Sequence, residues 1–154
     1  MGCSKKLGEK THAVATILGR ELRPLVEEWL RRINLVPALA LRPLNNEDRA
    51  GYLPKLFHDL ICRLSLPERT LPRISASAVA HGQKRRSQRY SPAMLVEESR
   101  VLQVVTFRTL HLHKGELDQN QLLLDIMVIA DEVDLQLTQA MVGLTETKPA
   151  ESAA

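Results

Sequence analysis

Polar side chains that could form one connected site occur at helical spacing in the middle of the chain. His81, Arg85 and Gln88 are four and three residues apart, so they share one face of a predicted helix. Tyr90 follows at a turn, and Glu98 lies in the early turns of the next predicted helix. An imidazole, a guanidinium, an amide and a carboxylate in this order can form a buried hydrogen-bonded network. We predict that these five residues bind a ligand or a protein partner, and the alternative is that they only fix the angle between two helices.

Histidine phosphotransfer is an alternative chemistry for two parts of the chain. Phosphotransfer modules are helical bundles in which a lysine three residues after the histidine neutralises the phosphoryl group and a neighbouring glycine leaves room for the donor protein. His81 has the lysine, but Arg85 occupies the glycine position. His111 is followed by both the lysine and Gly115, near the predicted end of a helix. Phosphotransfer through His81 or His111 is therefore the second hypothesis for function.

Motifs for other catalytic chemistry are missing from the sequence. It contains no glycine-rich phosphate loop, nucleophile elbow, His-Glu-x-x-His or Cys-x-x-Cys pattern. Cys3 and Cys62 are too few and too far apart for a metal site or a disulfide framework. His111 and His113 are two residues apart, which turns their side chains about 200° from each other on a helix. We expect a non-enzymatic protein with no catalytic residue, no metal and no cofactor.

The elements that must position these residues are helices. Leucine occurs 26 times and aromatic residues only five times among the 154 residues, and apolar positions recur at three- and four-residue steps. This pattern predicts an all-α fold of about five helices in an antiparallel bundle, and a globin-like arrangement is also compatible with it. Proline within a helix removes a backbone donor, so we expect kinks at Pro24 and Pro54. The predicted helices span residues 14–33, 45–64, 74–89, 91–115 and 118–142.

One helical domain is predicted, because the length suits a single core. We expect a flexible leader over residues 1–11, the bundle over residues 12–143 and a disordered tail over residues 144–154. No apolar run approaches the length of a membrane span, and cysteine is scarce, so we expect a cytoplasmic protein that does not bind membranes.

Charge is distributed unevenly, although the net charge is only +3. Residues 84–89 carry four positive charges and no acid, whereas residues 116–146 carry seven acids and no base. The acidic helix could pack beside the basic one or be a solvated face, or the two could be self-complementary docking surfaces in a homodimer. We expect no nucleic-acid binding, because Tyr90 is the only aromatic residue beside the basic run.

The segment from His81 to Leu102 reads His-Gly-x-x-Arg-x-x-Gln-x-Tyr-Ser-x-x-x-Leu-Val-x-Glu-x-x-x-Leu. It resembles the N-terminal domain of RsbRD-type RsbT co-antagonists, which also precedes some bacterial sensor histidine kinases. Arg89, Ser99 and Gln103 stand where that family has glycine, tyrosine and arginine. The resemblance implies a bacterial regulatory input domain that relays stress signals to a partner of stressosome or kinase type.

The first hypothesis is therefore a non-enzymatic sensory module, dimeric and acting through protein contacts or a small signal. The two prolines would allow its helices to shift between two packings. Under this hypothesis Arg85→Ala should leave the helix content intact and change dimerisation or partner response. A bundle that serves only for structural dimerisation is a further alternative.

Overall fold

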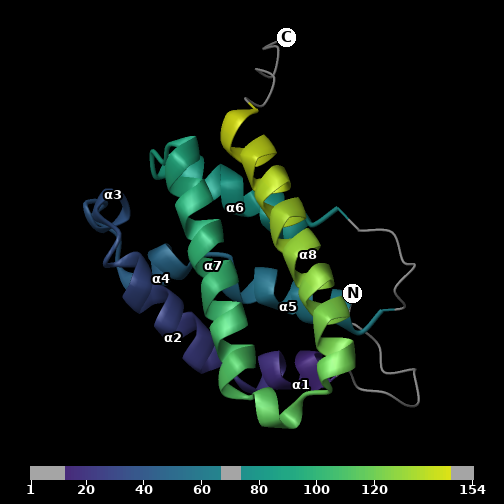
Figure 1. Ribbon diagram of the computed structural model, residues 1–154. Coiled ribbons are helices and arrows are strands. Elements are labelled where there is room, and N and C mark those ends of the chain that lie inside the picture. Colours follow the sequence, from purple (N-terminus) through teal and green to yellow (C-terminus); the bar gives the residue numbers. More distant parts are fainter. Residues whose placement is uncertain (1–12, 67–73, 147–154) are drawn as a thin grey trace.

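The computed structural model describes residues 13–66 and 74–146, which form helices, turns and loops without any strand (Figure 1). The predicted all-α fold is confirmed, although the chain is divided into more helices than the five expected. The predicted leader and the last eight residues of the predicted tail lie outside the described residues. The helices are α1 (Ala13–Arg20), α2 (Leu22–Ile33), α3 (Pro37–Ala40), α4 (Asn46–Ala50), α5 (Leu53–Leu64), α6 (Ala76–Ser87), α7 (Pro92–Leu112), the 3₁₀ turn η1 (Lys114–Glu116) and α8 (Gln119–Thr145).

Two helix starts follow directly from capping chemistry. The side chain of Asn45 accepts a hydrogen bond from the Asp48 amide at 2.8 Å, which begins α4. The hydroxyl of Ser91 accepts one from the Met94 amide at 3.3 Å, and proline follows Ser91 as the first residue of α7. Both starts were predicted, because a short polar side chain satisfies amides that no helical carbonyl can reach.

The prediction of a single kinked helix over residues 14–33 is wrong. It is divided into α1 and α2 at Glu21, whose backbone angles are φ −93° and ψ 10°. Pro24 lacks the amide that would bond the carbonyl of Arg20, so the chain bends one turn before the proline rather than at it. As a result α1 runs across the lower ends of the long helices in Figure 1.

The predicted kink at Pro54 and the predicted stop at Gly115 are also wrong. Pro54 is the second residue of α5, where no helical hydrogen bond is lost, and Gly51 at φ +52° separates α5 from α4. Gly115 belongs to the 3₁₀ turn, and α7 ends three residues before it. Because neither proline interrupts the middle of a helix, the proposed shift at kinked helices loses its structural basis.

The core is aliphatic around one tryptophan. The Trp29 side chain is 1% exposed and packs with leucines and valines from α1, α2, α5, α7 and α8. Its indole nitrogen donates to the carbonyl oxygen of Glu98 at 3.2 Å, so α2 is tied to α7 at the centre of the core.

Helices α6 and α8 approach each other most closely at two glycines. A Cβ atom on Gly82 would lie 1.8 Å from the carbonyl oxygen of Ala140, and one on Gly143 would lie 2.1 Å from the carbonyl oxygen of Val79. Nonbonded carbon and oxygen atoms cannot come that close, so only glycine permits this crossing.

The acidic helix α8 does pack beside the basic helix α6, but their charges are paired elsewhere. Lys84 of α6 contacts Asp48 at 3.5 Å. The acids Asp131 and Glu132 of α8 bind Arg63 of α5, with 2.9 Å between Arg63 Nη1 and Glu132 Oε2. Burial raises the pKa of Glu132, and Arg63 opposes this effect. Close backbone packing, not charge attraction, therefore holds α6 against α8.

Arg89 is the only described residue other than glycine with a positive φ, at 60°. A side chain in this left-handed region is strained, whereas glycine is not. We expect Arg89→Gly to raise the free energy of unfolding by about 0.5–1 kcal/mol in urea unfolding. The matched variant Arg86→Gly lies inside α6, and it should lower that free energy by a similar amount. A loss of stability in Arg89→Gly would contradict this interpretation of the turn.

Candidate functional site

The structure brings the guanidinium of Arg85 and the carboxylate of Glu98 together inside the bundle. Arg85 is 0% exposed and Glu98 is 3% exposed. Two contacts join them, from Nε to Oε2 at 3.0 Å and from Nη2 to Oε1 at 2.9 Å. The first contact is a hydrogen bond, and the second is an ion-pair contact in which Oε1 accepts no hydrogen bond. Together the two contacts link α6 to α7.

The remaining donors of Arg85 bind the chain between α4 and α5. Nη1 donates to the carbonyl oxygen of Asp48 at 3.0 Å and to the side-chain oxygen of Gln88 at 2.6 Å. Nη2 donates to the carbonyl oxygen of Arg49. Carbonyls at the end of a helix have no helical partner, so Arg85 satisfies the last turn of α4 from another helix. Nε, Nη1 and Nη2 of this buried cation each donate at least one hydrogen bond within the protein.

His81 extends the network by one residue. Its Nε2 lies 3.1 Å from Glu98 Oε2, and the imidazole is 5% exposed. The other ring nitrogen, Nδ1, is buried and makes no hydrogen bond with the described residues. The Tyr52 ring packs against the imidazole in a T-shaped arrangement, with 6.5 Å between ring centroids.

Tyr90 packs against Arg85 at the corner between α6 and α7, and its buried hydroxyl makes no hydrogen bond with the described residues. Its ring is buried, and the guanidinium carbon of Arg85 lies 4.8 Å from the ring centroid, as in a cation–π contact. Burial, and then the negative charge of Glu98, raise the pKa of the Tyr90 hydroxyl. The phenol therefore stays neutral at ordinary pH.

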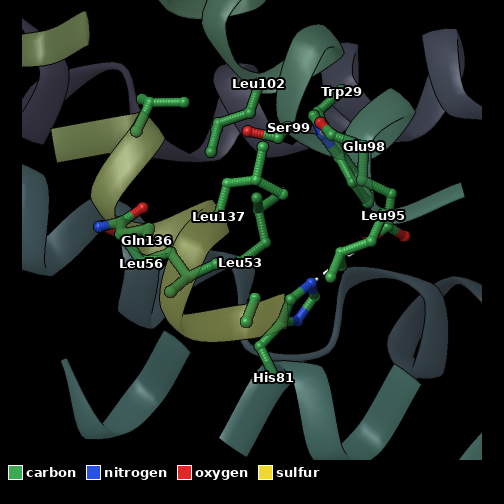
Figure 2. A pocket seen from close by; sticks show the side chains of 12 residues that line it. Trp29, Leu53, Leu56, His81, Leu95, Glu98, Ser99, Leu102, Gln136 and Leu137 are labelled. Atoms are coloured by element: carbon green, nitrogen blue, oxygen red, sulfur yellow. Dashed lines mark hydrogen bonds and ion pairs between the residues drawn. The ribbon is translucent and has the colours of Figure 1, made fainter. Parts of the chain in front are cut away.

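A small cavity of about 30 Å³ lies beside this network, where α2, α5, α6, α7 and α8 meet (Figure 2). The volume is enough for roughly two water molecules. Most of the wall is aliphatic, and Figure 2 shows leucines around the space with the His81 ring at one side and its contact to Glu98 as a dashed line. Side chains with polar atoms on the wall come from Trp29, His81, Glu98, Ser99 and Gln136.

All five residues predicted as a site lie in this region, but their accessibility differs. Only His81 and Glu98 line the cavity. Arg85 is enclosed behind them, and Gln88 lies half-buried at the end of α6 beside Arg85. A ligand in the cavity can therefore contact His81 and Glu98. Arg85, Gln88 and Tyr90 instead support these two residues.

Sequence reasoning did not find the groups that complete the network. The backbone carbonyls of residues 48 and 49 carry no sequence signal, because every residue has one. Gln136 was also missed. It lies on the buried side of α8 and donates to the carbonyl oxygen of Leu56 at 3.0 Å, and its polar type at a core position was the available signal.

The two histidines of the phosphotransfer hypothesis have different environments. His81 is buried and hydrogen-bonded, so a donor protein cannot reach it in this conformation. His111 is exposed near the end of α7. Within residues 13–66 and 74–146, no group of three or more histidine, cysteine or acidic residues is arranged to hold a metal ion. No helix in the same ranges is both long and apolar enough to cross a membrane.

Comparison of the chain with known protein families, with curated proteins and with solved structures found no match.

Proposed function

We propose that this protein is a non-enzymatic sensory domain in which the cavity beside His81 and Glu98 receives a small signal molecule. The observation that carries the proposal is the place of the cavity. One side of its wall is the buried pair of His81 and Glu98, and this pair continues through Arg85 to the backbone of α4. A molecule in the cavity would thus touch the same groups that hold α4, α6 and α7 together.

The small volume favours sensing over passive storage. A cavity of about 30 Å³ cannot take a molecule of several heavy atoms without movement of its walls. Close-packed cores respond to such strain by shifting whole elements, because they do not deform smoothly. Binding would therefore displace α7 or α8, and a protein partner could read the displacement at the surface.

The chemistry of the wall defines the class of ligand. Aliphatic side chains predominate, and the polar atoms come from a few side chains such as His81 and Ser99. A small neutral molecule with an apolar body and one hydrogen-bonding group fits this surface best.

The resemblance to RsbRD-type input domains agrees with this proposal at one backbone position. Family members have glycine where this chain has Arg89, and that residue adopts φ 60°, a conformation that favours glycine. We extend the proposal to a cytoplasmic bacterial stress-response role with a stressosome or kinase partner.

Nuclear magnetic resonance of the ¹⁵N-labelled full chain tests the cavity. Indole, benzyl alcohol and 1-butanol are suitable probes, because each has an apolar body and one hydrogen-bonding group. We expect saturable shifts for amides around Leu95 and Leu137, extending to Arg49, since the network links these regions. Absence of saturable shifts with all three probes would refute the proposed pocket.

A pair of variants on α8 separates binding in the cavity from binding at the surface. Leu137→Phe should fill the cavity and abolish the shifts, because Leu137 lies on its wall. Leu135→Phe is the matched control, since Leu135 is also half-buried on α8 but does not line the cavity. Equal shifts in both variants would show that the probes bind elsewhere.

A further inference from the structure

The short helix α3 and the residues that flank it, 34–43, form an apolar protrusion that is here termed the α3 loop. The side chains of Leu35 and Leu41 in this loop are 70% and 83% exposed. The other exposed apolar residues of the loop are Pro37, Ala38, Ala40 and Pro43. Figure 1 shows α3 beyond the end of α2 and apart from the long helices α7 and α8. Adjacent exposed apolar residues of this kind mark a contact site for a protein or a membrane.

The α3 loop is held in place from the inside. Leu39 is 0% exposed and anchors the loop in the core. Arg49 is 3% exposed, and it donates to the carbonyl oxygen of Leu39 at 2.9 Å and to that of Arg42 at 2.7 Å. A buried cation thus fixes the backbone of the loop while Leu35 and Leu41 face outward. The exposure of these two leucines is therefore built into the fold.

The backbone of the α3 loop bonds mostly with itself. Of the eight amides in the loop, seven donate to carbonyl oxygens three or four residues earlier in the chain, namely those of residues 34, 35, 36, 39, 40, 41 and 42. Pro37 and Pro43 have no amide to satisfy. A segment can enter the apolar part of a bilayer only when its backbone groups are paired internally, because no water is present there. The α3 loop comes close to meeting this condition.

Positive charge flanks the apolar part of the loop. Arg31 and Arg32 lie before the loop and Arg42 lies in it, with no charged residue between Arg32 and Arg42. Glu28 pairs with Arg31 at 2.8 Å and with Arg32 at 2.6 Å. The side chain of Arg42 makes no ion pair with the described residues, and the next acid along the chain is Glu47 in α4. The charges nearest along the chain to the exposed leucines are therefore positive, which complements an anionic surface.

We propose that the α3 loop inserts Leu35 and Leu41 into the surface of an anionic lipid bilayer, with Arg42 at the level of the lipid phosphates. Apolar side chains bind in this way at the boundary between headgroups and acyl chains, and neighbouring arginines add attraction to anionic lipids. The sequence predicted no membrane binding because it contains no spanning segment, but peripheral insertion needs no span. This inference goes beyond the sensory proposal and does not depend on the cavity.

A groove on a protein partner is the alternative for such a loop. Specific protein interfaces carry about one hydrogen bond per 100–200 Å² of contact. Among residues 34–41, Asn34 has the only polar side chain, and most amides are already bonded within the loop. The α3 loop therefore offers few groups for directional recognition. A bilayer surface requires only apolar area and positive charge, so we favour it as the partner.

Cosedimentation of the full chain with vesicles of phosphatidylcholine and about 30 mol% phosphatidylserine tests the proposal. We expect the wild-type chain to bind, and the double variant Leu35→Ser with Leu41→Ser to bind at least about tenfold more weakly, because it loses apolar surface that lipid would bury. Leu112→Ser is the matched control: Leu112 is 68% exposed outside the loop, and binding should not change. Absence of wild-type binding would overturn the proposal in favour of a protein partner, and an equal loss in the control would also overturn it.

Charge removal tests the orientation of the loop. Arg42→Gln should weaken binding to the anionic vesicles about fivefold, because one positive charge near the lipid phosphates is lost. Arg108→Gln is the matched control, since Arg108 is exposed on α7 and outside the loop, and its effect should stay below about twofold. Unchanged helix content by circular dichroism distinguishes lost binding from a lost fold. Equal weakening by the two variants would refute the placement of Arg42 at the lipid surface. The probe experiments on the cavity are read independently of these results.

Discussion

Replacing Arg85 by methionine should lower the free energy of unfolding by about 3–5 kcal/mol. The variant leaves the buried carboxylate of Glu98 without its cation and removes the donors for the carbonyls of Asp48 and Arg49. Methionine fills much of the same space, so the loss reports the missing charge and hydrogen bonds more than a cavity. Urea unfolding monitored by circular dichroism measures the change.

Arg86→Met is the matched control for this experiment. Arg86 is the next residue on α6, is exposed, and donates only to the carbonyl oxygen of Glu146 at 2.7 Å. Its replacement should change the free energy of unfolding by less than about 0.5 kcal/mol. If both variants lost the same amount, the buried network would not be a principal source of stability.

A double variant shows that the loss comes from the unpaired charge. Removing Glu98 together with Arg85, as Arg85→Met with Glu98→Leu, eliminates both buried charges at once. The double variant should lose less stability than the sum of the two single variants, because each single variant strands one charge. Additive losses would argue against a direct coupling.

This expectation revises what the sequence predicted for Arg85. From spacing alone, Arg85→Ala was expected to keep the helices intact and to change dimerisation or partner response. The structure places the guanidinium at 0% exposure with all three of its nitrogens hydrogen-bonded, so its removal must first affect folding. The sensory proposal consequently rests on the cavity wall at His81 and Glu98 and not on contact with Arg85.

Adding a single methyl group at residue 82 should have the second large effect on the free energy of unfolding. We expect Gly82→Ala to lower the free energy of unfolding by about 2–3 kcal/mol, although alanine favours helix by about 1 kcal/mol. The new Cβ atom would lie 1.8 Å from the carbonyl oxygen of Ala140, so α6 and α8 must separate. Gly143→Ala should act in the same way, because its Cβ would meet the carbonyl oxygen of Val79 at 2.1 Å.

Gly19→Ala provides the control with the same chemical change. Gly19 lies in α1, and no atom within 4 Å would meet its Cβ. This variant should raise the free energy of unfolding by up to about 1 kcal/mol through helix propensity alone. A gain of stability in Gly82→Ala as well would contradict the close crossing of α6 and α8.

Local signals predicted the helical segments well but not their divisions. The helices predicted to begin at residues 45 and 91 do begin there, with Asn45 and Ser91 as caps, because capping depends only on neighbouring residues. The apolar period could not show that the chain turns at Glu21, since the stripe continues through the bend. Pro54 was misassigned for a similar reason: the sequence did not show whether proline lies inside a helix or at its first turn.

The sequence predicted which residues lie together in the candidate site, but not which of them are accessible. Helical spacing places His81, Arg85 and Gln88 on one side of α6, and Glu98 follows on the next helix. Spacing cannot show which of these side chains is covered by α4, because that depends on contacts between residues about 36 positions apart in the chain. The cavity had no sequence signal at all, since it is formed jointly by five helices.

Reading the amino-acid sequence alone was enough to predict that this chain is helical, rich in leucine, and polar at one corner between two helices. These properties follow from the period of apolar residues and from local hydrogen bonding, which act over a few residues. Two features could be known only from the folded structure: Arg85 is enclosed, and His81 and Glu98 border a cavity. Burial depends on which distant segments pack together. Between α6 and α8 this packing requires Gly82 and Gly143, because only glycine lets the two backbones come so close.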